Sequence, residues 1–120
     1  MMEKKFIIPP EDIQPLAMGY GECIIPDTVL VSGMPITHIF RVAPENRLDS
    51  GWRFYSGIET PGYMKDRQGV YDVNIAANYC PEIIQFLDSL PYTAFEKAAD
   101  GRWYDVTLST DWTGLLRGVD

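Results

Sequence analysis

The side chains best suited to chemistry lie together in the first half of the sequence. The run Asp49-Ser50-Gly51-Trp52-Arg53-Phe54 combines an acid, a hydroxyl, a base and a large aromatic, and Gly57 and Glu59 follow closely. Two carboxylates near an arginine could perform acid–base chemistry or clamp an anionic group. This combination is more particular than an ordinary strand requires, so we expect any function to be centred here.

The same residues also have a purely structural interpretation. Asp49 or Ser50 would cap a loop, while Arg53 forms an ion pair across a sheet with Glu59 or Asp72. This interpretation is favoured over catalysis because nothing in the spacing forces the groups together. Ser50 also lacks the glycine two positions earlier that a nucleophile elbow needs, so hydrolase chemistry is weakly supported.

The usual metal ligands are sparse and scattered. His38 is the only histidine, and it alternates with Ile36 and Phe40, so we expect it to pack rather than to act as a base or ligand. Cys23 and Cys80 are far apart and lack the short spacing of zinc sites. We predict no metal, no cofactor and two reduced, buried cysteines.

Size and charge narrow the class of protein. With 120 residues and 46% hydrophobic content, the chain suits one domain with a real core. The formal net charge is −7, which opposes binding to a phosphate backbone and suits a basic protein partner or simple solubility. Pro9-Pro10 interrupts the only apolar run after Lys4-Lys5, so we predict neither a signal peptide nor membrane insertion and expect a cytoplasmic protein.

The motif needs strands to position it. Residues 1–21, rich in proline and glycine, predict an arm with one helical turn at 10–13, and residues 22–120 predict a single domain. Two β-rich segments, 22–31 and 35–41, predict a hairpin. Residues 51–56 predict the next strand, with Trp52 and Phe54 on one face and Arg53 and Tyr55 on the other. We expect Trp52 to be the central core aromatic.

The second half predicts a helix and another hairpin. Residues 57–70 form a long connection, and Pro81 to Leu90 carries an apolar stripe that predicts the main helix, preceded by a possible turn at 74–79. Asp100-Gly101 predicts a tight turn between two final strands. We expect Trp112, Leu115 and Leu116 to dock the end of the chain. The fold class is α+β: one bent antiparallel sheet with the helix packed on it.

An ordered series of motifs spans residues 23–95. Its members are Arg41-x-x-Pro44, Asp49 to Phe54, Gly57-x-Glu59, Tyr63-Met64, Gly69-x-Tyr71-Asp72, Asn78-Tyr79-x-Pro81, Ile83-Ile84 and Leu87. The series resembles the bacterial family called domain of unknown function 2185, also classed as an immunity protein of polymorphic toxin systems. The resemblance implies a small α+β domain that neutralises a toxin by binding it, and it supplies no catalytic residues. Thr37 to Phe40 and Val42 depart from that family's pattern, which bears on the identity of the partner.

Two hypotheses for function follow. In the first, the chain is a non-catalytic immunity protein whose acidic residues steer a basic toxin enzyme and whose Tyr63 or Tyr71 anchors it. In the second, it is a small enzyme or ligand-binding domain with a pocket lined by Trp52, Arg53 and Glu59. A deep pocket holding Arg53 and a carboxylate of raised pKa would favour the second. The candidate binding residues are Asp49, Trp52, Arg53, Glu59, Tyr63, Asp66, Tyr71 and Asp72.

Overall fold

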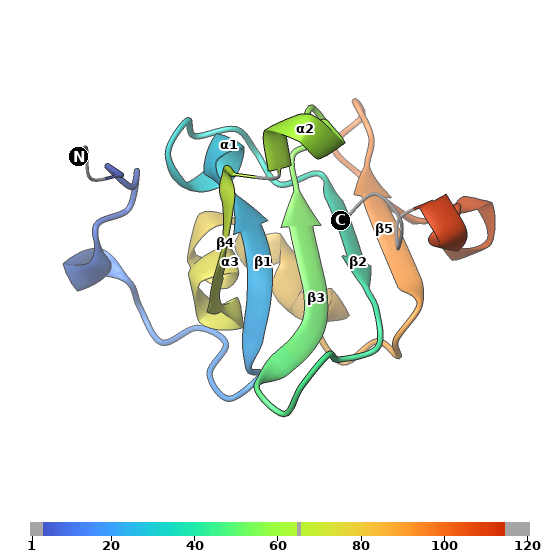
Figure 1. Cartoon of the computed structure of the whole chain (residues 1–120), viewed down its shortest axis with the longest axis horizontal. Helices are drawn as coiled ribbons and strands as arrows, with labels where there is room; N and C mark the ends of the chain where they lie inside the picture. Colours follow the sequence, from blue (N-terminus) through green and yellow to red (C-terminus); the bar gives the residue numbers. More distant parts are fainter. Residues whose placement is uncertain (1–3, 65, 115–120) are drawn as a thin grey trace.

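The computed structural model describes residues 4–64 and 66–114, which form a six-stranded sheet with short helices around it (Figure 1). The strands are β1 Glu22–Pro26, β2 His38–Arg41, β3 Asp49–Tyr55, β4 Gln68–Asp72, β5 Thr93–Lys97 and β6 Trp103–Asp105. The α-helices are α1 Asp27–Leu30, α2 Pro61–Met64 and α3 Val73–Tyr79, and the 3₁₀ helices are η1 Pro10–Asp12, η2 Pro81–Phe86 and η3 Thr107–Ser109. No helix in these ranges is long and apolar enough to cross a membrane. The α+β class is confirmed.

The sheet is mixed, with strand order β4-β1-β3-β2-β5-β6. β1 and β3 run parallel, whereas the other neighbouring pairs are antiparallel. The expected hairpin between 22–31 and 35–41 is wrong, because β3 inserts between β1 and β2. The β-rich segment 22–31 ends as a strand at Pro26 and continues as the buried turn α1, which carries the chain away from the sheet.

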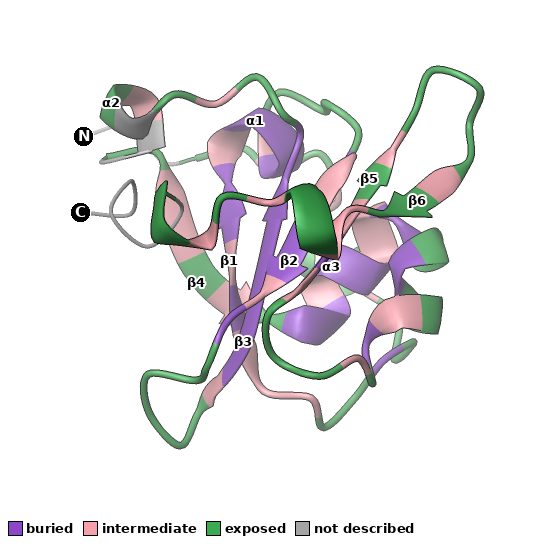
Figure 2. Cartoon of the chain, turned by 90° about the vertical axis from the view of Figure 1, so that its right-hand side faces the viewer, coloured by how far each residue is buried: buried purple, intermediate pink, exposed green. Residues whose placement is uncertain are grey.

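One face of the sheet packs against α3 and η2 and forms the main core. Trp52 and Phe54 are fully buried there with their rings stacked, and the Trp52 Nε1–H donates to the Leu87 carbonyl at 3.2 Å. Arg53 and Tyr55 point to the opposite face, where Tyr55 stacks with Phe40. Figure 2 shows β3 coloured as buried over most of its length, beside β1, which alternates between intermediate and buried residues. The prediction that Trp52 is the central core aromatic is confirmed.

The main helix is not where the sequence predicted it. The α-helix of seven residues is α3, which starts because the Asp72 carboxylate caps it by accepting from the Asn74 N–H at 2.8 Å. Cys80, with φ −149° and ψ 84°, ends α3, and the segment from Pro81 forms the 3₁₀ helix η2. Ile83 is buried there. The apolar stripe between Pro81 and Leu90 marks residues packed against the core without requiring a long α-helix.

The remaining predicted elements are found in part. η1 falls within the turn expected at 10–13, and β5 and β6 flank Asp100-Gly101 as predicted. The connection 57–70 is not a plain loop, since it contains α2 and the start of β4. Trp112 packs its ring edge-on against Phe40 and Tyr92. Leu115 and Leu116 lie outside the described residues.

Gly51 shapes the centre of the sheet. Its φ is +88°, and a Cβ at this position would lie 2.1 Å from the Val42 carbonyl oxygen. Along β1 the register advances from Glu22 to Ile24, while along β3 it advances from Asp49 to Arg53. β3 therefore accommodates two extra residues around Gly51, as a bulge does.

We predict that Gly51→Ala destabilises the fold far more than Gly101→Ala. Gly101 also has positive φ, +82°, but a Cβ there meets nothing within 4 Å, so alanine costs only the left-handed strain of about 1–2 kcal/mol. At Gly51 the same strain is joined by a clash with fixed backbone, and we expect a loss of about 4 kcal/mol or more. Urea unfolding of the two variants tests this, and equal losses would contradict it.

Candidate functional site

Asp49 and Arg53 form a nearly buried ion pair on the face of β3 opposite Trp52. Arg53 Nη1 lies 3.0 Å from Asp49 Oδ1, and Nη2 lies 3.1 Å from Oδ2, which is a two-pronged contact. The Arg53 side chain is 4% exposed and the Asp49 side chain is 11% exposed. In a regular strand, Cα atoms four residues apart are separated by about 13 Å, so the bulge at Gly51 favours this contact by kinking the strand. The expected pairing of Arg53 with Glu59 or Asp72 is wrong, because the kink supplies a partner on its own strand.

Asp49 also holds the loop before β3. Its carboxylate accepts from the Glu45 N–H and from the Gly51 N–H, both at 2.9 Å, so the prediction that Asp49 caps a loop is confirmed. Burial of the Asp49 carboxyl raises its pKa, but the hydrogen bonds from Arg53 and the two backbone N–H groups outweigh burial and hold that pKa below its ordinary value. Asp49 is therefore a saturated, ionised acceptor.

Glu59 plays a similar role beyond the other end of β3. Its carboxylate accepts from the N–H of Ser56 at 3.1 Å and of Gly57 at 2.9 Å, and from the hydroxyls of Ser56 and Thr28. Burial raises the pKa of Glu59, yet these donors together leave it below its ordinary value. Because Thr28 belongs to α1, Glu59 ties the connection after β3 to that buried turn.

The predicted pocket around Trp52, Arg53 and Glu59 is not assembled by the described residues. Trp52 lies in the core on one face of β3, Arg53 faces the other way, and Glu59 lies past the end of the strand. Neither carboxylate at the motif has the raised pKa expected of a general acid. The geometry thus gives the ligand-pocket hypothesis little support.

The other candidate residues are spread along the β4 side of the molecule. Tyr71 contacts Phe6 of the arm with its ring edge-on, at a centroid distance of 6.0 Å. The Arg67 guanidinium lies 5.1 Å from the centre of the Tyr63 ring. Asp66 is exposed. Their roles in binding stay predictions.

Sheet register gathers acidic residues that the sequence left apart. Glu22 of β1 is paired with Asp49 on β3 and with Asp72 on β4, and Glu45 Oε1 lies 3.9 Å from Arg53 Nη2. No local pattern in the sequence marks Glu22 or Glu45 as members of this group. The β4-β1-β3 order places Glu22 between Asp49 and Asp72, and the loop before β3 brings Glu45 to Arg53.

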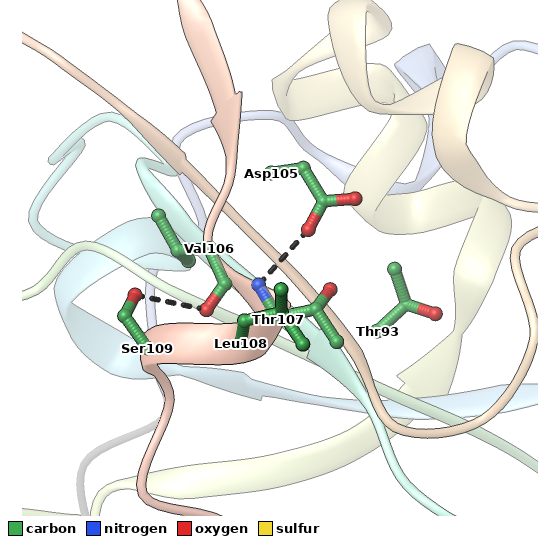
Figure 3. Close-up of a pocket in the computed structure, with 6 residues that line it drawn as sticks. All are labelled: Thr93, Asp105, Val106, Thr107, Leu108 and Ser109. Atoms are coloured by element: carbon green, nitrogen blue, oxygen red, sulfur yellow. Dashed lines mark hydrogen bonds between the residues drawn. The ribbon is translucent and has the colours of Figure 1, made fainter.

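A cavity of about 610 Å³ opens elsewhere, beside η3 (Figure 3). Its lining comes from Thr93, Asp105, Val106, Thr107, Leu108 and Ser109, none of which is a candidate site residue. The Asp105 carboxylate accepts from the Thr107 N–H at 2.9 Å. Within residues 4–64 and 66–114, no three His, Cys, Asp or Glu side chains are placed to hold a metal ion. Cys23 and Cys80 are buried and unpaired, as expected.

Comparison with known families identifies the domain. The sequence model of the Immunity protein Imm33 domain matches residues 23–107. The chain belongs to this immunity-protein family. No curated protein and no solved structure matches it. The prediction of an immunity protein is confirmed, while the designation as domain of unknown function 2185 stays a prediction.

The matched part of the immunity domain coincides with the sheet. It begins within β1 at Cys23 and ends within η3 at Thr107, so it includes the motif, α3 and η2. The arm lies outside it. In this Imm33 domain Asp49, Arg53 and Glu59 are part of the scaffold, since all three are engaged in internal contacts.

We predict strong energetic coupling between Asp49 and Arg53. Asp49→Asn should lower the free energy of unfolding by about 3 kcal/mol, because it leaves the buried guanidinium uncompensated. Arg53→Met should also destabilise, but the double variant should lose less than the two single losses added, with a coupling of about 2 kcal/mol. Urea unfolding of the four proteins gives the cycle. The same cycle on the surface pair Lys97–Glu82, 2.6 Å apart, should give a smaller coupling, and equal couplings would contradict our assignment.

We also predict that the contribution of Asp49 depends on pH in one direction. Because the folded pKa of Asp49 lies below the unfolded value of about 3.9, its stabilisation is complete above that value and is lost as the pH falls through the folded pKa. The stability difference between the parent and Asp49→Asn should thus be constant near neutral pH and shrink below about pH 4. Urea unfolding between pH 7 and pH 3 measures it, and a difference that grows on acidification would refute it.

Proposed function

We propose that this chain neutralises a toxin enzyme by binding it in a stoichiometric complex and that it catalyses no reaction itself. Membership of the Imm33 family is the basis for the toxin-neutralising role. Direct occlusion is the simplest physical means for a domain of 120 residues, because a standard interface needs only about 800 Å² of its surface.

The observation that supports a non-catalytic role is that the carboxylates of the motif are occupied by internal hydrogen bonds. Asp49 and Glu59 each accept several hydrogen bonds from neighbouring groups, and both have a pKa below the ordinary value. A general acid or base works best when its pKa lies near the operating pH and its proton can reach a substrate. Carboxylates that are ionised and saturated with donors favour a scaffold over a reaction centre.

Charge supports a basic partner. The formal net charge of −7 would attract a basic enzyme over a distance set by the Debye length, about 8 Å at physiological ionic strength, and would repel nucleic acid. Asp66 and Asp72 are exposed and suited to this steering, whereas Asp49 is engaged by Arg53. We place the complex in the cytoplasm, where the unpaired cysteines would stay reduced.

We predict that protection against the toxin becomes complete at an equimolar ratio of this chain to toxin. The product of the gene adjacent to that of this chain is titrated with the purified chain, and residual toxin activity is followed. A binding inhibitor should abolish activity at one chain per toxin, and the complex should elute as a single species in size-exclusion chromatography.

Two outcomes would overturn the proposal. Full protection at far less than one chain per toxin would mean that the chain acts catalytically. In that case a folded Glu59→Gln variant would protect less well than the parent. A lack of both protection and complex would remove the toxin-binding role itself. Glu59→Gln that melts at a lower temperature but keeps its equimolar endpoint would support a scaffold role for Glu59.

A further inference from the structure

Three large hydrophobic side chains are exposed on the arm and on the loop before β3. Leu16, Met18 and Leu48 are 46%, 64% and 67% exposed. The arm and the loop before β3 meet here, since the Glu22 N–H donates to the Leu48 carbonyl at 2.7 Å. A Cβ on Gly21 would lie 2.7 Å from the same oxygen, so the two segments are in close contact. Adjoining segments that each expose large apolar side chains mark an interaction surface more often than isolated exposed residues do.

Asparagine side chains on α3 fix the arm in place. Asn74 Oδ1 accepts from the N–H groups of Leu16 and Ala17, each at 2.8 Å, and Asn74 Nδ2 donates to the Gln14 carbonyl at 2.8 Å. Asn78 adds a pair of contacts to Gln14, accepting from its N–H and donating to its carbonyl, both at 2.8 Å. Asn74 is buried. With its backbone held at Gln14, Leu16 and Ala17, the arm has less backbone entropy to lose on binding.

Acidic side chains lie on the segments that adjoin the arm and this loop. Glu45 precedes Leu48 in the loop and its side chain is 72% exposed, and the exposed Asp72 is next to Val73, whose N–H donates to the Gly21 carbonyl. Asp88 is exposed and adjoins Tyr20, whose pKa is raised by burial and by the Asp88 charge. The one exposed cation within the loop is Arg47. The surface therefore combines an apolar centre with a negative border.

We propose that this arm–loop surface docks a basic face of the toxin. The surface consists of Leu16, Met18, Leu48, Glu45, Asp72 and Asp88. The proposal rests on the toxin-binding function proposed above and names where that binding takes place. It replaces Tyr63 and Tyr71 as the anchors, because Tyr71 packs on Phe6 and Tyr63 lies against Arg67.

Charge decides between the possible occupants. An apolar centre inside a polar border is the usual composition of a protein interface. A second copy of this chain would set acid against acid, which costs binding energy, whereas a basic protein face would complement the border. Leu16 and Met18 of this surface lie outside the family match at 23–107, and its other four residues lie inside it.

The first test removes the apolar centre. Met18→Ser with Leu48→Ser should raise the Kd for the adjacent-gene product at least about 100-fold, as loss of two anchors does. Leu108→Ser, at a side chain that is 102% exposed on the far side of the sheet, is the matched control and should leave the Kd within about twofold. Melting curves of all variants should match the parent, because the three side chains are solvent-exposed.

The second test removes charge from the border alone. The triple variant Glu45→Gln, Asp72→Asn, Asp88→Asn should slow association about tenfold at low salt and lose that difference at high salt. Asparagine preserves the cap of α3 at position 72. The control Asp100→Asn, Asp105→Asn, Asp111→Asn also removes three exposed carboxylates and should change the association rate much less.

The outcomes separate the two proposals. If the parent protein neither binds nor neutralises the adjacent-gene product, the proposed function is wrong, whichever surface is involved. If the parent binds but the arm–loop variants bind as tightly as their controls, the function stands and this surface is wrong. Hydrogen exchange on the complex of the intact chain should independently show protection at 14–22, 43–49 and 72–74, and protection confined to other segments would also overturn the surface.

Discussion

The structure depends on a left-handed kink at Gly51 that presses the backbone against the Val42 carbonyl. This kink lets β3 pair in parallel with β1 on one side and antiparallel with β2 on the other. The pairing register with β1 shifts along β3, whereas the register with β2 stays regular. It also brings Asp49 back toward Arg53. A side chain at Gly51 would oppose both arrangements at once, so one missing Cβ supports the register of three strands and the burial of a guanidinium.

The kink explains why the most polar part of the sequence is structural. Once Arg53 is buried, it needs a carboxylate with good geometry, and Asp49 supplies one while also closing the preceding loop. Glu59 performs the equivalent task for the connection that follows, through Ser56 and Thr28. The cost of burying these groups is offset by saturating them with hydrogen bonds. Little of their chemistry is then left for a substrate.

Sequence patterns predicted features that depend on a few neighbouring residues. The burial of Trp52 and the hairpin at Asp100-Gly101 follow from strand alternation and turn chemistry, and both were found. The parallel β1–β3 pair, the Asp49–Arg53 contact and the grouping of Glu22 with Asp72 depend on strand order and on the kink, which local patterns do not contain. The helix was misplaced for a related reason. Buried positions along Pro81 to Leu90 imitate a helical stripe, whereas the cap at Asp72 actually starts α3.

The same helix connects the scaffold to the proposed arm–loop surface. α3 begins at its Asp72 cap beside Glu22 and, through Asn74, holds the backbone at Leu16 and Ala17. Damage to the motif would loosen β1 and β3 and hence the frame on which α3 and the arm rest, so neutralisation would fall in step with stability. Changes at Met18 or Leu48 act on exposed side chains and would weaken neutralisation without lowering stability. Plotting one quantity against the other over a set of variants therefore distinguishes residues that build this immunity domain from residues that contact its toxin.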